Sequence, residues 1–252
     1  MNIESGYVPL SCAECAAGAG LGFDFSMAFQ PIVDTNYRII FSYEALVRGP
    51  NNEPASWVLS QVHDHNRYRF DQACRVKAIK TASELGMQSF LNINFLPNAV
   101  YQPETCIRTT LQAAKEYTFP VEKIIFEVTE GEKVSDPIHL DSIMKEYKHR
   151  GFLTAIDDFG AGYSGLNLLA KFQPNYVKLD MALTRNIDQD RIKRTIVNSI
   201  IQVCRELDIR VIAEGIETKD ELASLQDLGL TLFQGYLFAK PAFESLPVVK
   251  FE

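Results

Sequence analysis

The chain has 252 residues, 46% of them apolar and 23% charged, which is typical of a globular protein. Its net charge of −7 and its lack of a lysine- or arginine-rich run argue against a DNA or RNA polymer as partner. No apolar run is long enough to span a bilayer, no basic n-region precedes Arg38, and the five cysteines are odd and sparse, so we expect a cytoplasmic protein without membrane insertion.

Residues 1–24 are rich in glycine, alanine and serine, and they show no regular hydrophobic pattern. We therefore predict an irregular N-terminal segment, followed by one domain over residues 25–252. The segment contains Cys12 and Cys15 in a CxxC arrangement. Such a pair can be half of a zinc site or a redox pair, but no second CxxC or HxxxH accompanies it, so ordinary thiols are the favoured interpretation.

From residue 25 onward, short apolar segments alternate with longer segments of helical period. The strand candidates are 25–33, 39–47, 90–95, 123–129, 152–157, 176–181, 210–214 and 232–237. One of the helical segments carries a single apolar stripe formed by Ile192, Ile196, Ile200, Val203 and Leu207. Eight strands, most of them followed by a helix, predict an α/β fold, a TIM-like (β/α)8 barrel. Residues 34–38 are too few for a helix, so we expect a hairpin and a first strand antiparallel to the others.

Functional residues of such barrels lie at the C-terminal ends of the strands. Seven strand candidates carry a carboxylate, an amide or an ammonium group near that end. Burying one unpaired charge costs several kcal/mol, so seven independent structural accidents are a poor explanation. The polar residues at these ends include Glu44, Asn94, Glu127, Asp157, Asp158, Lys178, Glu214 and Gln234.

Asp157 and Asp158 end an apolar strand and precede a loop with three glycines between residues 160 and 165. Neighbouring side chains of a strand face opposite ways, so both carboxylates can reach one site only where the backbone turns. Glycine permits such a turn. By itself the pair is more typical of a turn and a helix cap than of a metal site.

The surrounding residues change that interpretation because acid is in excess. Among these strand ends, only Lys178 and Arg48 oppose the carboxylates of Glu44, Glu127, Asp157, Asp158 and Glu214. Without cations these groups would repel one another and several would protonate. Oxygen ligands without cysteine or histidine favour Mg²⁺ or Mn²⁺ over Zn²⁺. Two such ions bridged by a shared carboxylate are the usual apparatus for hydrolysing phosphodiesters.

The ordered motifs resemble those of the EAL-domain cyclic di-GMP phosphodiesterases, a family named after the tripeptide Glu44-Ala45-Leu46. The resemblance spans about residues 25–242. It rests on eight motifs in the family's order: Phe29-Gln30-Pro31-Ile32, Tyr43-Glu44-Ala45-Leu46-Val47-Arg48, Asn94, Glu127-Val128-Thr129-Glu130, Asp157-Asp158-Phe159-Gly160-Ala161-Gly162-Tyr163-Ser164, Lys178-Leu179-Asp180, Ala213-Glu214-Gly215-Ile216-Glu217-Thr218 and Gln234-Gly235-Tyr236.

This resemblance implies a barrel with an antiparallel first strand and hydrolysis of cyclic di-GMP to linear pGpG. It also implies two Mg²⁺ or Mn²⁺ ions, with Ca²⁺ expected to bind and inhibit. The implied metal ligands are Glu44, Asn94, Glu127, Asp157 and Asp158, with Asp157 as the bridge. Lys178 resembles the group that orients the attacking water, and Glu214 either sits near the second ion or acts as a base, so these two and Glu44 are the candidate catalytic residues.

The remaining matched positions suggest supporting roles. Gln30, Arg48 and Gln234 resemble substrate contacts. Glu130 and Glu217 resemble residues that hold the ligands or the loop 158–165 from behind, although Glu217 could simply begin a helix over 218–229. The resemblance also implies a homodimer, in which that loop and the neighbouring helix take part.

Two departures from the family pattern are small: Gly165-Leu166-Asn167 replaces a commoner serine–leucine run, and Leu179 stands where isoleucine is more usual. Neither removes a carboxylate, so we expect an active enzyme. Some proteins of this kind have lost catalysis. A catalytically silent cyclic di-GMP receptor and a protein-interaction module are therefore the alternatives, and the input signal is not indicated.

Overall fold

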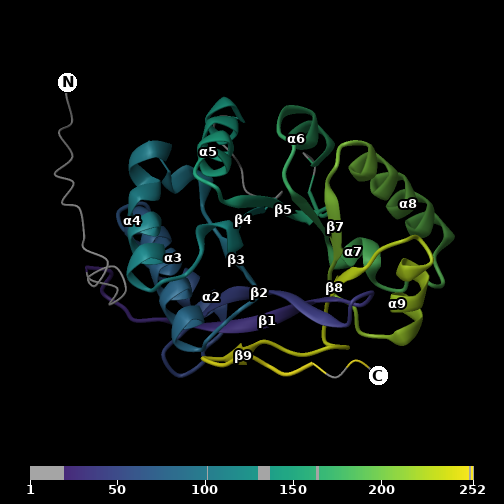
Figure 1. The fold of residues 1–252 in the computed structure, drawn as a ribbon, viewed down its shortest axis with the longest axis horizontal. Helices are drawn as coiled ribbons and strands as arrows, with labels where there is room; N and C mark the ends of the chain where they lie inside the picture. Colours follow the sequence, from purple (N-terminus) through teal and green to yellow (C-terminus); the bar gives the residue numbers. More distant parts are fainter. Residues whose placement is uncertain (1–19, 101, 130–136, 163–164, 250, 252) are drawn as a thin grey trace.

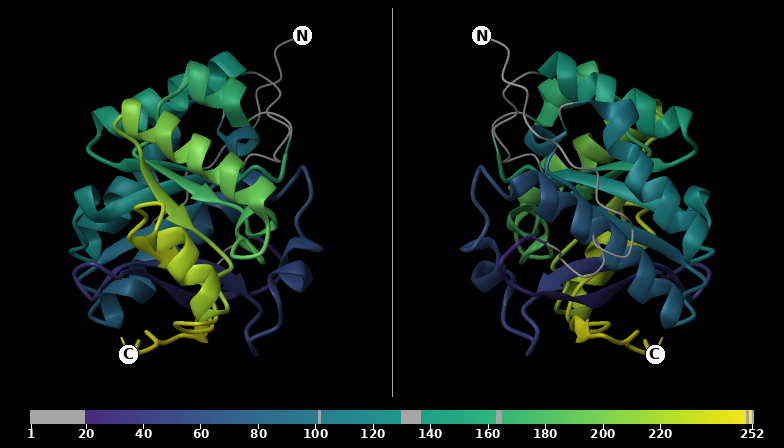
Figure 2. Two further views of the ribbon diagram at one scale, coloured as in Figure 1. Left: turned by 90° about the vertical axis from the view of Figure 1, so that its right-hand side faces the viewer. Right: turned by 90° about the vertical axis from the view of Figure 1, so that its left-hand side faces the viewer.

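The computed structural model describes residues 20–100, 102–129, 137–162, 165–249 and 251, and all structural statements below concern this part of the chain. Cys12, Cys15 and Glu130 lie outside it. The described strands form one nine-stranded sheet in the order β2-β3-β4-β5-β6-β7-β8-β1-β9, and a further β1–β2 pairing closes it into a barrel. Helices surround most of the barrel in all three views (Figures 1 and 2).

The strands agree closely with the predicted segments. They are β1 (Ser26–Asp34), β2 (Ile39–Arg48), β3 (Phe90–Asn94), β4 (Ile124–Thr129), β5 (Leu153–Phe159), β6 (Tyr176–Leu179), β7 (Arg210–Ala213), β8 (Leu232–Gln234) and β9 (Ala242–Phe243). The last predicted strand ends at residue 234 rather than 237, since the chain turns at Gly235. The short strand β9, which was not predicted, pairs with β1.

The helices that connect these strands are likewise consistent with a (β/α)8 barrel. They are α2 (Ala55–Leu59), α3 (Arg67–Glu84), α4 (Pro103–Glu116), α5 (Pro137–His149), α6 (Gly165–Lys171), α7 (Met181–Thr184), α8 (Arg191–Glu206) and α9 (Lys219–Gln226). Two 3₁₀ turns, η1 (Pro97–Ala99) and η2 (Val121–Lys123), complete the described elements. Among the described helices, none combines the length and the apolar composition that crossing a lipid bilayer requires.

The predicted hairpin between β1 and β2 is confirmed, and β1 runs antiparallel to both β2 and β8. Asp34 explains the tight turn, because its Oδ1 accepts hydrogen bonds from the backbone N–H groups of Asn36 and Tyr37. With no helix between these strands, β9 and the C-terminal segment lie along this side of the barrel (Figure 1).

The interior of the barrel has an apolar layer below a polar layer. The apolar layer lies toward the N-terminal ends of the parallel strands and toward the C-terminal end of the antiparallel β1. It consists of Ile32, Phe41, Ile125, Ala155, Tyr176, Ile212 and Leu232. Residues two positions apart on a strand share a face. The inward side chain that follows Ile125 is therefore Glu127, and the same step leads from Tyr176 to Lys178. The strand period thus places the polar side chains together at one end.

The predicted apolar stripe on α8 faces outward. Ile192 is 73% exposed and Ile196 is 45% exposed, whereas Val197 and Ile201 on the opposite side of the helix are buried against the barrel. The helix itself was therefore predicted correctly. Its contact with the core, however, is made by Val197 and Ile201 and not by the exposed residues of the predicted stripe. This leaves an unpartnered apolar face within the described chain.

Candidate active site

Lys178 stands at the centre of the polar layer. Its side chain is fully buried on β6, and its Nζ makes ion pairs with four carboxylates that come from different strand ends. The partners and distances are Glu44 Oε2 at 3.1 Å, Glu127 Oε2 at 3.0 Å, Asp157 Oδ1 at 2.9 Å and Glu214 Oε1 at 2.9 Å. One ammonium group therefore joins β2, β4, β5 and the residue after β7.

This single cation does not balance the acids around it. Burial raises the pKa of Glu127 to about 8, against the opposing charge of Lys178 and with a further contribution from Glu44. Burial likewise raises the pKa of Asp157 and of Glu214. Without bound cations, the protein therefore disfavours the charged forms of Glu127, Asp157 and Glu214, and additional positive charge at the site would stabilise them.

The charged forms of Lys178 and Glu44 are favoured by their neighbours in the cluster. Burial opposes the charge of Lys178, but the four surrounding carboxylates raise its pKa well above the usual value. Burial also opposes the charge of Glu44, yet Lys178 and hydrogen bonds from Gln234 and Asn94 lower its pKa. An ionised carboxylate is the form that a metal ion binds.

Side-chain amides fix the orientation of two of these carboxylates. Asn94 Nδ2 donates to Glu44 Oε1 at 2.9 Å, and Gln234 Nε2 donates to Glu44 Oε2 at 2.8 Å. Asn92, two residues before Asn94 on β3, donates from Nδ2 to Glu127 Oε1 at 2.6 Å. The regular spacing of Asn92 and Asn94 on one strand face is the signal that identifies this pair.

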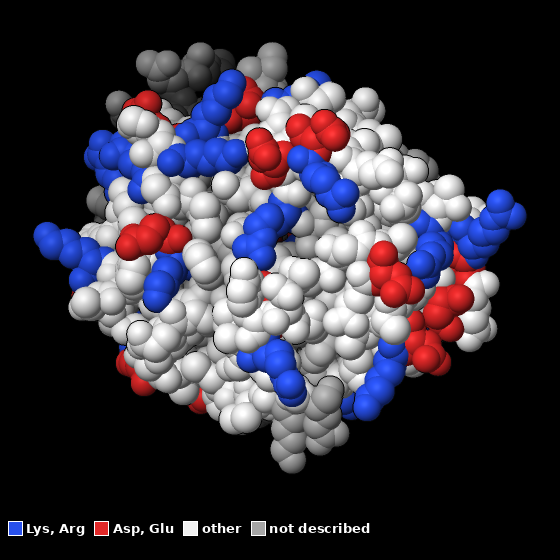
Figure 3. Space-filling view, turned by 45° about the vertical axis from the view of Figure 1, so that its right-hand side comes forward, with Lys and Arg blue, Asp and Glu red and all other residues white. Residues whose placement is uncertain are grey.

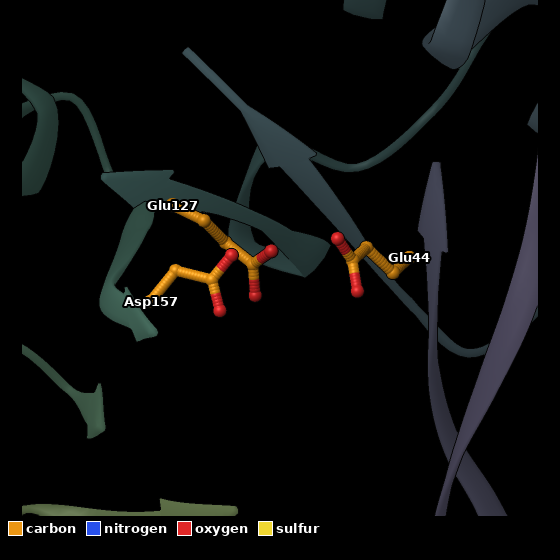
Figure 4. Close-up of side chains that lie close together, drawn as sticks. All are labelled: Glu44, Glu127 and Asp157. Carbon is orange, nitrogen blue, oxygen red and sulfur yellow. The ribbon is translucent and has the colours of Figure 1, made fainter. Parts of the chain in front are cut away.

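Two groups of carboxylates could each hold a cation. The first is Glu44, Glu127 and Asp157, whose side chains converge in Figure 4, and the second is Asp157, Asp158 and Glu214. Within each group, ligand oxygens lie within 4.8 Å of one another. Asp157 belongs to both groups, which fits a bridging role. This all-oxygen donor set, with its excess of acid, fits two hard divalent cations.

Asp158 reaches the site because its backbone leaves the extended conformation. Its φ is +53°, in the left-handed region, and the pairing of β5 with β6 is irregular between Ile156 and Phe159. The left-handed conformation is tolerated by aspartate better than by most residues. The expected turn thus lies within β5 rather than after it. Burial, followed by the charges of Asp157 and Asp180, raises the pKa of Asp158 to about 6.

The predicted substrate contacts line the mouth of the barrel and its wall. Gln30 is buried beside Gln234, whose Nε2 lies 3.3 Å from Gln30 Oε1. Arg48 ends β2, is partly exposed, and donates from Nη1 to its neighbour's carbonyl, Val47 O, at 2.7 Å. Burial lowers the pKa of Arg48, while the nearby Tyr236 and Glu44 act in the opposite direction.

Glu217 does not join the cluster. Its carboxylate pairs with Arg185 at 2.7 Å, and its side chain is 45% exposed. Helix α9 is instead capped by Thr218 and Glu221, whose side chains and backbone N–H groups form a reciprocal capping box. Glu217 therefore precedes the cap and links the end of β7 to the segment after α7.

Gly235 is required by the close approach of two site-bearing strand ends. A Cβ at this position would overlap the backbone N and O of Ile216. Ile216 N in turn donates to Gln234 O at 3.1 Å, so the segment that follows Glu214 is hydrogen-bonded directly to the end of β8. The absence of a side chain at Gly235 therefore helps to set the positions of both candidate site residues, Glu214 and Gln234.

We expect Gly235→Ala to lower the free energy of unfolding by about 3 kcal/mol, because the backbone after β7 must move. Gly86→Ala is the matched control. Gly86 has a φ of +69° but nothing within 4 Å of an added Cβ, so only backbone strain of about 1 kcal/mol is expected. Urea unfolding of both variants measures the difference, and equal losses would show that the predicted overlap has no effect.

Comparison with known proteins agrees with this geometry. The EAL domain family model matches residues 21–241. The chain belongs to the EAL domain family. A crystal structure of a standalone EAL protein from Vibrio cholerae O395, in its c-di-GMP-bound form, aligns with a TM-score of 0.89 and 58% identity over 91% of this chain and 97% of that chain. The manganese/cy-diGMP complex of Klebsiella pneumoniae BlrP1 aligns with a TM-score of 0.84 and 34% identity over 91% of this chain and 60% of that one.

Curated relatives of this EAL domain are longer proteins. The blue light- and temperature-regulated antirepressor BluF of Escherichia coli K12 is 33% identical over 88% of this chain and 55% of its own length. The cyclic di-GMP phosphodiesterase PdeR of the same organism is 34% identical over 59% of this chain and 22% of its own length. The chain thus spans about half or less of the length of these two relatives.

Proposed function

We propose that this EAL domain is a metal-dependent phosphodiesterase that hydrolyses cyclic di-GMP to linear pGpG. The observation that carries the proposal is the convergence of two carboxylate groups, sharing Asp157, around the buried ammonium of Lys178. A receptor for an anionic dinucleotide needs fewer carboxylates beside its ligand. An excess of acid with a shared ligand fits two cations that bind the phosphodiester.

Glu44, Asn94, Glu127, Asp157 and Asp158 would hold two Mg²⁺ or Mn²⁺ ions. When bound, these ions supply a more acidic water and neutralise charge on the phosphodiester. Lys178 would orient the attacking water and stabilise charge that develops on phosphate oxygens. Glu214, a carboxylate of raised pKa in contact with Lys178, can accept a proton. Arg48 would bind phosphate with its planar fork of N–H groups.

Related proteins support cyclic di-GMP as the proposed substrate. PdeR is named a cyclic di-GMP phosphodiesterase, and the Vibrio and Klebsiella structures contain the dinucleotide. The Klebsiella complex also contains manganese. BluF, in contrast, is named an antirepressor, so the alternative functions remain a cyclic di-GMP receptor or a protein-interaction module without hydrolysis.

The test is to incubate the protein with cyclic di-GMP and Mg²⁺, Mn²⁺ or Ca²⁺ and to measure product formation by liquid chromatography. We expect linear pGpG with Mg²⁺ and Mn²⁺, and inhibition by Ca²⁺, which tolerates looser geometry and activates water less well. Glu44→Gln should remove turnover while retaining a side chain of the same size. Binding of the dinucleotide without turnover would favour the receptor, and failure to bind would favour the interaction module.

The pH dependence of stability tests the acid excess. A carboxyl whose folded pKa is raised stabilises the fold fully below its unfolded pKa, and this contribution is lost as the pH rises through the folded pKa. For Glu127, the loss falls between about pH 4.5 and about pH 8. We therefore expect the melting temperature of the metal-free protein to fall by about 5 °C between pH 5 and pH 8.

Mg²⁺ should remove most of that fall, because bound cations favour the ionised carboxylates. Differential scanning fluorimetry compares the melting temperature of the protein in EDTA with that in about 10 mM Mg²⁺, a concentration chosen to saturate the site. A melting temperature that rises steadily over this pH range without metal would contradict the raised pKa values.

We further propose a homodimer formed through the outward apolar face of α8. Ile192, Ile196, Val203 and Leu207 on this face are each at least 40% exposed, and Leu166 of α6 is 65% exposed. The side of the molecule that carries α8 shows uncharged surface between scattered charged side chains (Figure 3). The resemblance to EAL proteins supports a second copy of this chain as the occupant.

We expect Ile196→Glu to shift the protein from dimer to monomer in light scattering coupled to size-exclusion chromatography. The buried charge would have no partner in the interface, which costs several kcal/mol. Val248→Glu is the matched control, because Val248 is 87% exposed and follows Pro247, whose carbonyl accepts a hydrogen bond from Tyr43 of β2. A wild-type protein that is monomeric at all concentrations would contradict the proposal.

A cytoplasmic location is also a proposal. Cys74, Cys106 and Cys204 are free thiols in the described chain, and this supports a reducing compartment. Cell fractionation with an antibody to the native protein would test it.

A further inference from the structure

A buried ion pair lies on the outer face of the barrel, outside the carboxylate cluster. Asp71 and Arg75 are one turn apart on α3, and their side chains are 1% and 0% exposed. Arg75 Nη2 lies 2.7 Å from Asp71 Oδ2. A buried pair of this kind is a poor source of stability, because desolvation offsets most of the attraction. Stability alone therefore does not explain why the pair is buried here, and its contacts indicate another role.

The two charges contact three further elements. Arg75 Nη1 donates to the hydroxyl of Tyr147 on α5 at 2.7 Å. The guanidinium also lies over the rings of Phe95 and Phe126, 5.4 and 5.0 Å from their centroids. Asp71 Oδ1 accepts the backbone N–H of Leu96 at 2.9 Å. The pair thus ties α3 to α5 and to the ends of β3 and β4.

Those contacts fall beside two candidate metal ligands. Phe95 directly follows Asn94, and Phe126 directly precedes Glu127. Adjacent strand residues face opposite ways, so the rings point outward to Arg75 while the ligands point into the barrel. The backbone N–H of Phe95 donates to Glu127 O at 3.1 Å, which joins the two strand ends directly. Fixing the rings from outside therefore fixes the backbone of both ligands.

We propose that Asp71, Arg75 and Tyr147, called here the α3 clamp, position Asn94 and Glu127 for cation binding. The proposal rests on the proposed function in that it takes these two residues as metal ligands. The planar guanidinium suits the role, since it stacks on two rings while it pairs with Asp71. Residues that orient metal ligands from behind typically change metal affinity by about 10- to 100-fold when they are replaced.

The test is the affinity of the protein for Mn²⁺ alone, measured by electron paramagnetic resonance of free Mn²⁺. The variant Asp71→Asn/Arg75→Met removes both charges, so no buried charge is left unpaired, and asparagine keeps an oxygen for Leu96 N–H. We expect its Mn²⁺ dissociation constant to rise about 10-fold. Arg75→Lys keeps the charge beside Asp71 but lacks the planar stacking group, and about a 3-fold rise is expected.

Arg210→Met is the matched control at the other end of the barrel. Arg210 also stacks on two rings, those of Phe41 and Tyr176 at 5.1 and 5.8 Å, and pairs with Asp34 at 3.6 Å. We expect it to lower the melting temperature without changing Mn²⁺ affinity. If the α3 clamp had only a structural role, its variants would likewise lower the melting temperature and leave the Mn²⁺ affinity unchanged.

Wild-type Mn²⁺ affinity in the double variant would therefore overturn the proposal. If the double variant does not fold, wild-type affinity in Arg75→Lys would overturn it instead. A wild-type protein that binds no Mn²⁺ would overturn both the clamp and the metal site. A wild-type protein that binds Mn²⁺ without hydrolysing cyclic di-GMP would overturn only the proposed function.

Discussion

Replacing Lys178 by methionine is expected to lower the melting temperature of the metal-free protein by about 10 °C. The change removes the ammonium group that contacts Glu44, Glu127, Asp157 and Glu214, and breaking a buried ion pair from one side costs about 3–5 kcal/mol. The loss should be larger at pH 8 than at pH 6, because the carboxyls can protonate at lower pH. Scanning fluorimetry at both pH values measures it.

Mn²⁺ should restore part of the melting temperature of this variant, since bound cations replace some of the missing positive charge. Turnover should remain at least about 100-fold below wild type, because the group that orients water and stabilises developing charge is absent. Lys77→Met is the control, as Lys77 pairs with the exposed Asp24 at 3.2 Å outside the barrel. Unchanged stability of metal-free Lys178→Met would show that the ammonium does not balance the cluster.

Asp157→Asn is expected to have the second large effect, a loss of at least about 1,000-fold in turnover. Asp157 belongs to both carboxylate groups, whereas Asp158 belongs to one. Asparagine keeps the shape but cannot bridge two cations with a charged carboxylate. Mn²⁺ titration should therefore give two bound ions for wild type and none at comparable concentration for Asp157→Asn.

Asp158→Asn is the matched comparison, because it is the adjacent residue with the same chemistry. It should retain one tightly bound ion at the group formed by Glu44, Glu127 and Asp157. Equal stoichiometry in the two variants would remove the reason for assigning the bridge to Asp157. Turnover measured in parallel shows whether both ions are needed.

Much of the fold follows from local patterns. The strand period places Glu127 two residues beyond the apolar Ile125, and this is enough to predict that polar side chains meet at one end of a barrel. The short link between β1 and β2, residues 35–38, is too short for a helix and predicts their antiparallel pairing, and Asp34 supplies the turn. These features depend on neighbours in sequence.

Features set by distant neighbours could not be predicted. Helical period identified the stripe of Ile192 and Ile196, but it could not show that Val197 and Ile201 take the buried side instead. The left-handed backbone of Asp158 depends on the irregular pairing of β5 with β6. Four carboxylates converge on Lys178 only through barrel closure. Likewise, a sequence shows Asp71 and Arg75 one helical turn apart, but not that both are buried against two strand ends.

The two-cation site is tested most directly by anomalous X-ray scattering from crystals of this chain soaked with Mn²⁺. We expect two manganese peaks, one among Glu44, Asn94, Glu127 and Asp157 and the other among Asp157, Asp158 and Glu214. Asp157 should contact both. A single peak that Asp157 does not contact, or no peak near Lys178, would contradict the two-cation site on which the proposed phosphodiesterase depends.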